Sequence, residues 1–239
     1  MKNKDYKKYL YAATAILMVA AIIIIFFYSP VPVKLSRGII ESDADWMNRN
    51  YSFHISYFHI PIALTAYLSF FFVLIYSIQY LRDPKQIWDI KAVASAEVGV
   101  IFAGLTLITG SIWAGAAWEH YWPPGDIRLN TSLVLFLIYL AYLSVRSAID
   151  VPDKRARLSA VFGIIGFITV PISFYSIRIW SSTHPKVVDG GGFHGNAIIL
   201  PILLNMVAFV LLCISLITFK VDNLNLQEDL IAAKNEKGV

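Results

Sequence analysis

The sequence predicts an all-α membrane protein with six transmembrane helices and both termini in the cytoplasm. Hydrophobic residues make up 57% of the 239 residues, and charged residues only 15%, whereas a soluble domain carries about a quarter charged residues. The apolar residues also gather in six runs, each close to the roughly 20 residues that cross a bilayer. We expect one polytopic membrane domain over residues 1–239, without an internal repeat or a separate soluble domain.

The six expected spans follow one another with short polar connections. They cover about residues 9–28, 57–80, 92–112, 129–145, 158–177 and 196–219. The first follows four lysines and resembles a signal peptide, but its apolar run is too long and no small-x-small site follows it. We therefore expect a retained signal anchor. Pro171 and Pro201 fall inside spans and are expected to kink them, with the freed carbonyls satisfied by neighbours or water.

Lysine and arginine residues set the predicted orientation. With the N-terminus inside, 14 of the 20 lie on the cytoplasmic side and 6 on the outer side, which is the bias that membrane proteins show. Under this topology all five histidines lie outside or at the outer membrane boundary. They are His54, His59, His120, His184 and His194.

Two residues within the spans are candidates for special roles. Glu97, near the inner end of the third span, is interpreted as a carboxylate that reaches the headgroups; a buried functional carboxylate is the less favoured alternative. Cys213, the only cysteine, lies in the last span, so no disulfide forms within the chain. No C-x-x-C-H stretch exists either, which excludes covalent c-type haem attachment. We interpret Cys213 as a small apolar residue.

Two of the histidines lie next to prolines at the outer ends of spans. His59 lies in SYFHIPIAL, and because Pro61 suits the first turn of a helix, we expect a helix end that aims the imidazole at the outer surface. His184 lies in WSSTHPKVV, where Pro185 favours extended backbone and a stiff loop. Each alone is typical of an interfacial hydrogen-bonding residue. As a pair on the same side of the membrane, they make axial ligation of haem iron about as favoured as that interpretation.

The segment GSIWAGAAWEHYWPPGDIRLN is unusually aromatic. Four large rings fall within ten positions, and a Pro-Pro-Gly turn and two charged residues follow: Trp113, Trp118, Tyr121 and Trp122, then Asp126 and Arg128. An ordinary interfacial aromatic belt is one interpretation. The alternative is a platform for a flat ligand such as a porphyrin, with Asp126 as a helix cap and Arg128 as a fork-shaped donor to a carboxylate. His120 lies within the segment and could line a ligand edge; His54 and His194 have no comparable context.

The longer run GSIWAGAAWEHYWPPGDIRLNTSLVLFLIYLAYL resembles the WWD segment of the haem-handling proteins of cytochrome c maturation, and most closely the CcmC family. Residues 113–128 would then form an outward-facing WWD-like segment. The resemblance implies haem b as cofactor, with His59 and His184 as the metal ligands. Its remaining haem-binding residues would be Trp113, Trp118, Tyr121, Trp122, Asp126 and Arg128. The family usually has a tryptophan directly before the aspartate, and here Pro123, Pro124 and Gly125 replace it.

The same resemblance implies a non-enzymatic, multi-pass protein of the cell (inner) membrane. It would bind haem at the periplasmic face and present it to the haem chaperone CcmE during cytochrome c maturation. The implied partners are the ATP-binding cassette subunits CcmA and CcmB and the small subunit CcmD. The chain contains no P-loop motif, so any ATP-driven step requires a partner. We expect no nucleic-acid partner.

Three other functions remain open. An electron-transferring cytochrome b subunit usually buries its haem ligands within facing spans, and no histidine is predicted deep inside one. A permease for haem or another solute usually has polar groups at midplane, where only the off-centre Glu97 is a charged candidate. In the third alternative, an assembly scaffold, the tryptophan cluster binds a protein instead of haem.

Overall fold

The protein is a bundle of long helices. The computed structural model describes residues 5–30, 47, 51–180, 184 and 196–237, and this part of the chain contains helices and no strand. Six of its helical segments are long and apolar enough to cross a membrane, which confirms the predicted fold class. The helices are α1 Asp5–Phe27, the 3-10 turn η1 Phe53–Ile55, α3 Ser56–Arg82, α4 Gln86–Trp118, α5 Ile127–Ser147, α6 Pro152–Gly166, α7 Thr169–Ile179 and α8 Asn196–Lys237.

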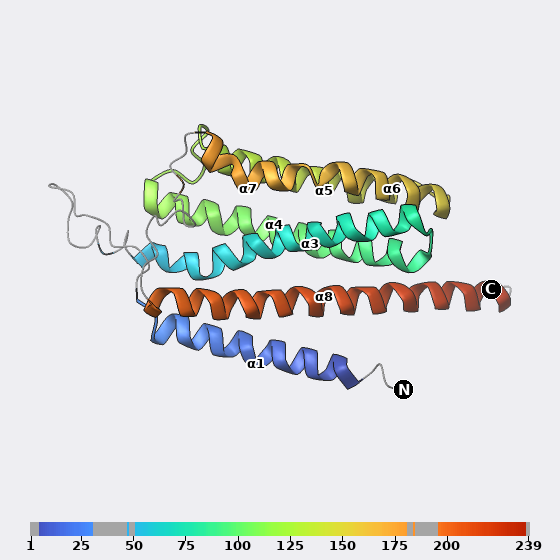
Figure 1. Ribbon diagram of the computed structural model, residues 1–239, viewed down its shortest axis with the longest axis horizontal. Coiled ribbons are helices and arrows are strands. Elements are labelled where there is room, and N and C mark those ends of the chain that lie inside the picture. Colours follow the sequence, from blue (N-terminus) through green and yellow to red (C-terminus); the bar gives the residue numbers. More distant parts are fainter. Residues whose placement is uncertain (1–4, 31–46, 48–50, 181–183, 185–195, 238–239) are drawn as a thin grey trace.

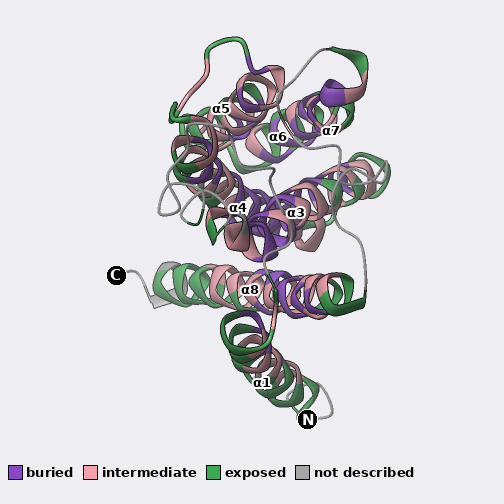
Figure 2. Ribbon diagram, turned by 90° about the vertical axis from the view of Figure 1, so that its left-hand side faces the viewer, coloured by how far each residue is buried: buried purple, intermediate pink, exposed green. Residues whose placement is uncertain are grey.

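Helices α3 and α4 form the centre of the bundle. Figure 1 shows α5, α6 and α7 along one side of this pair and α8 along the other, with α1 outermost against α8. Figure 2 shows that burial is concentrated where α3, α4 and α8 meet. Both chain termini lie at one end of the bundle, as an even number of spans requires. The end where α4 finishes and α5 begins is the opposite one.

The fifth span is broken by a proline. Pro171 cannot donate a hydrogen bond to the carbonyl of Phe167, and its ring crowds that carbonyl. Helix α6 therefore ends at Gly166 and α7 starts at Thr169, while the Phe167 carbonyl accepts from Val170 N at 3.0 Å. The predicted kink is confirmed there. Pro201 lies near the start of α8, which continues through it.

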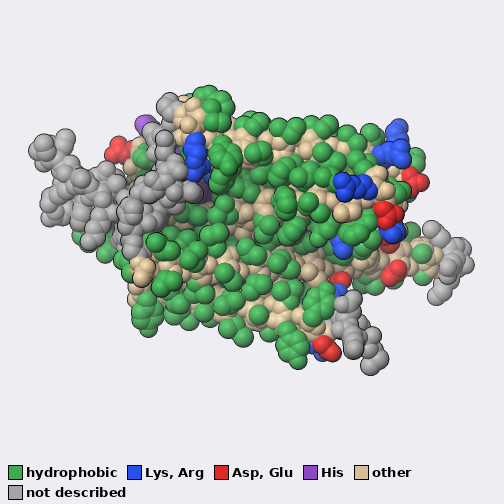
Figure 3. Space-filling model, viewed as in Figure 1, with side chains coloured by type: hydrophobic (Ala, Val, Ile, Leu, Met, Phe, Trp, Pro, Cys, Tyr) green, Lys and Arg blue, Asp and Glu red, His purple; other side chains and the backbone are tan. Residues whose placement is uncertain are grey.

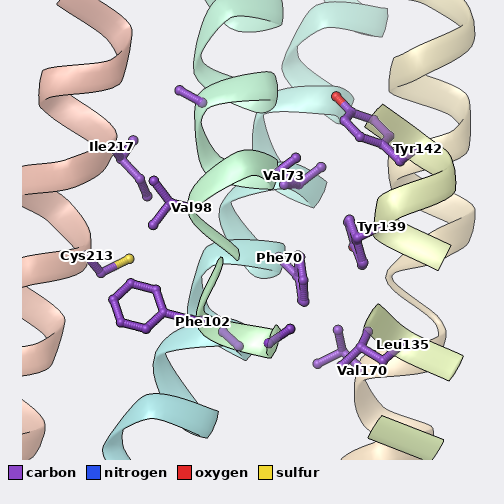
Figure 4. Packing of buried hydrophobic residues seen from close by; sticks show 14 of the residues in the cluster. Phe70, Val73, Val98, Phe102, Leu135, Tyr139, Tyr142, Val170, Cys213 and Ile217 are labelled. Carbon is purple, nitrogen blue, oxygen red and sulfur yellow. The ribbon is translucent and has the colours of Figure 1, made fainter. Parts of the chain in front are cut away.

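Small residues let the central helices approach closely. The rings of Phe70 and Tyr139 stack with centroids 3.6 Å apart (Figure 4). On the other side of the Phe70 ring lies Gly99 of α4. A Cβ atom at position 99 would lie 2.5 Å from that ring, so glycine allows α3 and α4 to approach this closely. Cys213 is fully buried, and its Sγ lies 3.2 Å from the Ser69 hydroxyl. It is the small buried residue that the sequence predicts.

Charged side chains gather at the end of the bundle that carries the termini. Figure 3 shows them at that end, separated from the other end by a broad apolar band. Asp89 on α4 and Arg146 on α5 form a buried pair with two contacts of 2.6 Å. The carboxylate of Glu97 lies 2.5 Å from Lys220 Nζ on α8. Glu97 therefore serves to pair two helices as well as lying near the expected headgroup level.

Candidate functional site

The aromatic segment and two of the histidines meet at the end of the bundle remote from the termini. His59 lies in the first turn of α3, Trp113 and Trp118 in the last turns of α4, and His184 beyond α7. The His184 ring centroid lies 5.5 Å from that of Trp113 and 5.9 Å from that of Trp118, with both indoles approaching edge to face. The two indoles are 5.1 Å apart. Residues far apart in the sequence thus form one cluster.

The predicted orientation of the His59 side chain is wrong. Helix α3 starts at Ser56, so Pro61 is its sixth residue and not part of its first turn. The His59 ring is 9% exposed and points between α3 and α4, where a Cβ atom on Gly110 would lie 3.1 Å from its Cε1 atom. His59 therefore faces the interior of the bundle end, and Gly110 leaves room for the imidazole.

Thr109 fixes the tautomer of His59. The Thr109 hydroxyl donates its single proton to the Leu105 carbonyl at 2.7 Å, so its oxygen is an acceptor toward His59 Nδ1, 2.8 Å away. When the ring is neutral, Nδ1 then carries the proton and Nε2 presents a lone pair. Metal-binding histidines are typically held in this way, with the second ring nitrogen donating to a neighbouring oxygen. The Thr109 contact therefore suits the neutral tautomer in which Nε2 can bind a metal.

His184 is partly buried beside the indoles. Burial and, to a smaller extent, the charge of Arg128 lower the pKa of His184 to about 4, while Asp126 acts in the opposite direction. The imidazole is consequently neutral near pH 7 and able to donate an electron pair to a metal.

The separation of the two imidazoles suits one metal between them. Their ring centroids are 6.4 Å apart. A metal–imidazole bond is about 2 Å long and a ring nitrogen lies about 1.2 Å from its centroid, so two axial imidazoles have centroids roughly 6.4 Å apart. Trp113 lies beside this space, with its ring centroid 6.3 Å from that of His59. A flat macrocycle around the metal would occupy part of the volume of that indole, so a side chain must shift before one can enter.

A small cavity adjoins both histidines. Its volume is about 30 Å³, it is partly open to the surroundings, and the residues that line it include His59, His184, Tyr67, Trp122, Arg128 and Ser132. Trp122 is oriented by a hydrogen bond from its Nε1 to Asn130 Oδ1 at 3.3 Å. Tyr121 packs over Gly115, is 71% exposed and is not one of the cavity's described lining residues. The structure therefore brings the three tryptophans to the site but leaves Tyr121 at its outside.

The two charged residues after the Pro-Pro-Gly turn have separate tasks. Asp126 caps α5, accepting from the main-chain N–H groups of Arg128 at 2.9 Å and Leu129 at 3.1 Å. Arg128 donates from Nη1 to the carbonyls of Ser173 and Phe174 at 2.8 and 2.9 Å. Arg128 also lines the cavity, where its fork-shaped guanidinium is suited to a carboxylate.

The other histidines have local roles or none. His54 Nε2 lies 3.2 Å from the Ser29 carbonyl, and His120 is exposed. His194 lies outside the described residues. Among those residues there is no cluster of three or more His, Cys, Asp or Glu side chains. The sequence contained no signal for Thr109 or Tyr67, since threonine and tyrosine are common on the apolar helices of membrane proteins.

Comparison with known proteins gives similarity over most of the chain. The family description that matches, over residues 3–236, is heme exporter protein C. The heme exporter protein C of Bradyrhizobium diazoefficiens is 34% identical over 194 residues, which are 77% of this chain and 72% of that protein. That of Paracoccus denitrificans is 33% identical over 127 residues, 53% of this chain and 52% of the relative. That of Escherichia coli K12 is 26% identical over 187 residues, 78% and 76% of the two chains.

Proposed function

The chain belongs to the heme exporter protein C family, and from this premise we propose that it binds haem b at the periplasmic face of the inner membrane and presents it to the chaperone CcmE. The observation that carries the proposal is the pair of imidazoles, with centroids 6.4 Å apart, beside two indoles. The orientation rests on the excess of Lys and Arg on the side of the termini, which is the cytoplasmic side by the positive-inside rule.

In the proposed mechanism, each residue of the site has a task in holding the haem. His59 would bind the iron through Nε2, with Thr109 accepting the proton on Nδ1, and His184 would supply the second imidazole. Trp113, Trp118 and Trp122 cover the macrocycle with apolar surface. The Arg128 guanidinium would receive a propionate, while its Nη1 keeps the side chain fixed to α7.

Haem entry and release require one of these side chains to move. Trp113 lies 6.3 Å from His59 and 5.5 Å from His184, and we infer that a shift of Trp113 or His184 opens the space between the imidazoles. Because the residues that would hold haem lie at the end of the bundle, an acceptor could reach the bound haem from outside the bundle. The protein performs no covalent step in this scheme; CcmA, CcmB and CcmD would supply the energy and the remaining contacts of the complex.

The ligand assignment is tested by the absorbance spectrum. The protein, expressed with ample haem and purified in mild detergent, should carry low-spin haem, and His59→Ala or His184→Ala should each lower the haem content and shift the spectrum. His120→Ala is the matched control, because His120 follows the end of α4 on the same side of the bundle but is exposed. A wild-type protein without pigment, or a pigment indifferent to both substitutions, would overturn the proposal.

Presentation to the chaperone is tested separately. Affinity purification of wild-type protein from membranes that also contain CcmE should recover CcmE with haem attached, and both histidine variants should recover less of the haem-bearing form. Recovery of a quinone-reducing complex instead would favour the electron-transferring cytochrome.

A further inference from the structure

The turn that carries His59 contains a main-chain carbonyl without its usual helical partner. In an α-helix the carbonyl of residue 57 accepts from the N–H of residue 61. Residue 61 is a proline and has no N–H group. Tyr57 and Pro61 are fully buried, so water does not replace the missing donor. A buried acceptor of this kind is costly unless another donor reaches it.

That donor comes from α8. The side-chain amide Nδ2 of Asn205 donates to the Tyr57 carbonyl, a contact between residues 148 positions apart. Asn205 is fully buried as well. The orientation of its amide follows from chemistry, because a carbonyl can only accept and the NH₂ group must therefore face it.

We propose that Asn205 is a positioning residue for His59. Asn205 on α8 holds the Tyr57 carbonyl in the turn that carries His59, and Thr109 on α4 contacts the His59 ring. Two different helices thereby fix the direction of Nε2. Asn205 does not line the cavity. It therefore acts on His59 only through the first turn of α3. The inference rests on the proposed function in one respect, namely that His59 ligates haem.

Four variants isolate this contact. Asn205→Leu removes the donor, and Pro61→Ala restores a main-chain N–H that can bond to the Tyr57 carbonyl in the usual way. The double variant combines both changes. Ser215→Ala is the control, because Ser215 also makes a buried contact from α8, 2.8 Å from the Thr14 hydroxyl on α1, but far from the site.

The first measurement is hydrogen exchange in haem-free protein, over the peptide that covers residues 53–64. Asn205→Leu should make this segment exchange about 5 to 30 times faster, the factor expected for one lost buried hydrogen bond. The Ser215→Ala variant should exchange there as the wild type does. In the Pro61→Ala background, Asn205→Leu should have little further effect. The second measurement is the haem spectrum, in which Asn205→Leu should convert part of the low-spin signal to high-spin and the double variant should restore it.

The possible outcomes separate this inference from the proposed function. The positioning role would be overturned if Asn205→Leu speeds hydrogen exchange over residues 53–64 equally in the wild-type and Pro61→Ala backgrounds. It would also be overturned if Asn205→Leu leaves that exchange unchanged. If Asn205→Leu does not fold, the double variant should fold, and its failure would count against the inference. Should the wild type hold no haem while exchange responds as expected, the contact stands and the haem proposal fails. A His59-dependent spectrum that is indifferent to Asn205 overturns the positioning role alone.

Discussion

Replacing Thr109 with valine removes the acceptor of the His59 Nδ1 proton while nearly keeping the shape of the side chain. The 2.8 Å hydrogen bond between Thr109 Oγ1 and His59 Nδ1 is lost, whereas the Leu105 carbonyl retains its bond within α4. A buried donor left without an acceptor costs about 1–3 kcal/mol. The haem-free ring can avoid this cost by moving its proton to Nε2, whereas a ring bound to iron through Nε2 cannot. At about 1.4 kcal/mol for each factor of ten, the cost corresponds to at most roughly a 5- to 150-fold weaker binding of haem. Loss of an orienting group around a metal ligand typically has an effect in the same range, about 10- to 100-fold.

The assay is a haem titration of purified protein in detergent, followed by absorbance. Thr109→Ser is the matched control, because serine keeps the hydroxyl that donates to Leu105 and accepts from His59. It should bind within a few-fold of the wild type. If Thr109→Val binds haem as tightly as Thr109→Ser and gives the same spectrum, then the hydroxyl does not set the tautomer of His59 and the reasoning is refuted.

Three further predictions concern the platform, the cap and the opposite end of the bundle. Combined Trp118→Ala and Trp122→Ala should lower haem occupancy without affecting membrane insertion; unchanged occupancy would return these rings to an interfacial belt. Asp126→Ala removes the α5 cap and should destabilise the protein by about 0.5–2 kcal/mol, measured as a lower midpoint of thermal unfolding. Asp89→Leu leaves Arg146 buried without its partner and should cost about 3–5 kcal/mol, yet the spectrum of any folded protein should be that of the wild type. A changed spectrum would mean that this distant pair influences the site.

The broad architecture was predictable because it depends on composition summed over many residues. Each span is recognised from a run of about 20 mostly apolar residues. A misread residue at a single position therefore leaves the six-helix result unchanged. The Asp126 cap was also predictable, since it precedes an apolar run directly and capping is a local interaction. The proximity of His59 and His184 was expected from their shared side of the membrane and from the family resemblance.

The supporting contacts were not predictable for two physical reasons. Helix α3 has Ile55 at its N-cap position and no side-chain cap hydrogen bond, so the sequence contained no start signal and Pro61 was assigned to the first turn. Thr109 and Asn205 are single polar residues on apolar helices, and their partners depend on how α4 and α8 are rotated against α3. Rotation is set by packing across the bundle, which single-residue patterns do not encode.

Electron paramagnetic resonance of the ferric protein with imidazole rescue tests the central claim most directly. His59→Gly and His184→Gly each remove one imidazole and leave space for a free one. We predict a low-spin signal typical of two imidazole ligands in the wild type, its loss in either variant, and its return when imidazole is added. A high-spin signal in the wild type, or a low-spin signal that persists in both variants without added imidazole, would contradict ligation by His59 and His184.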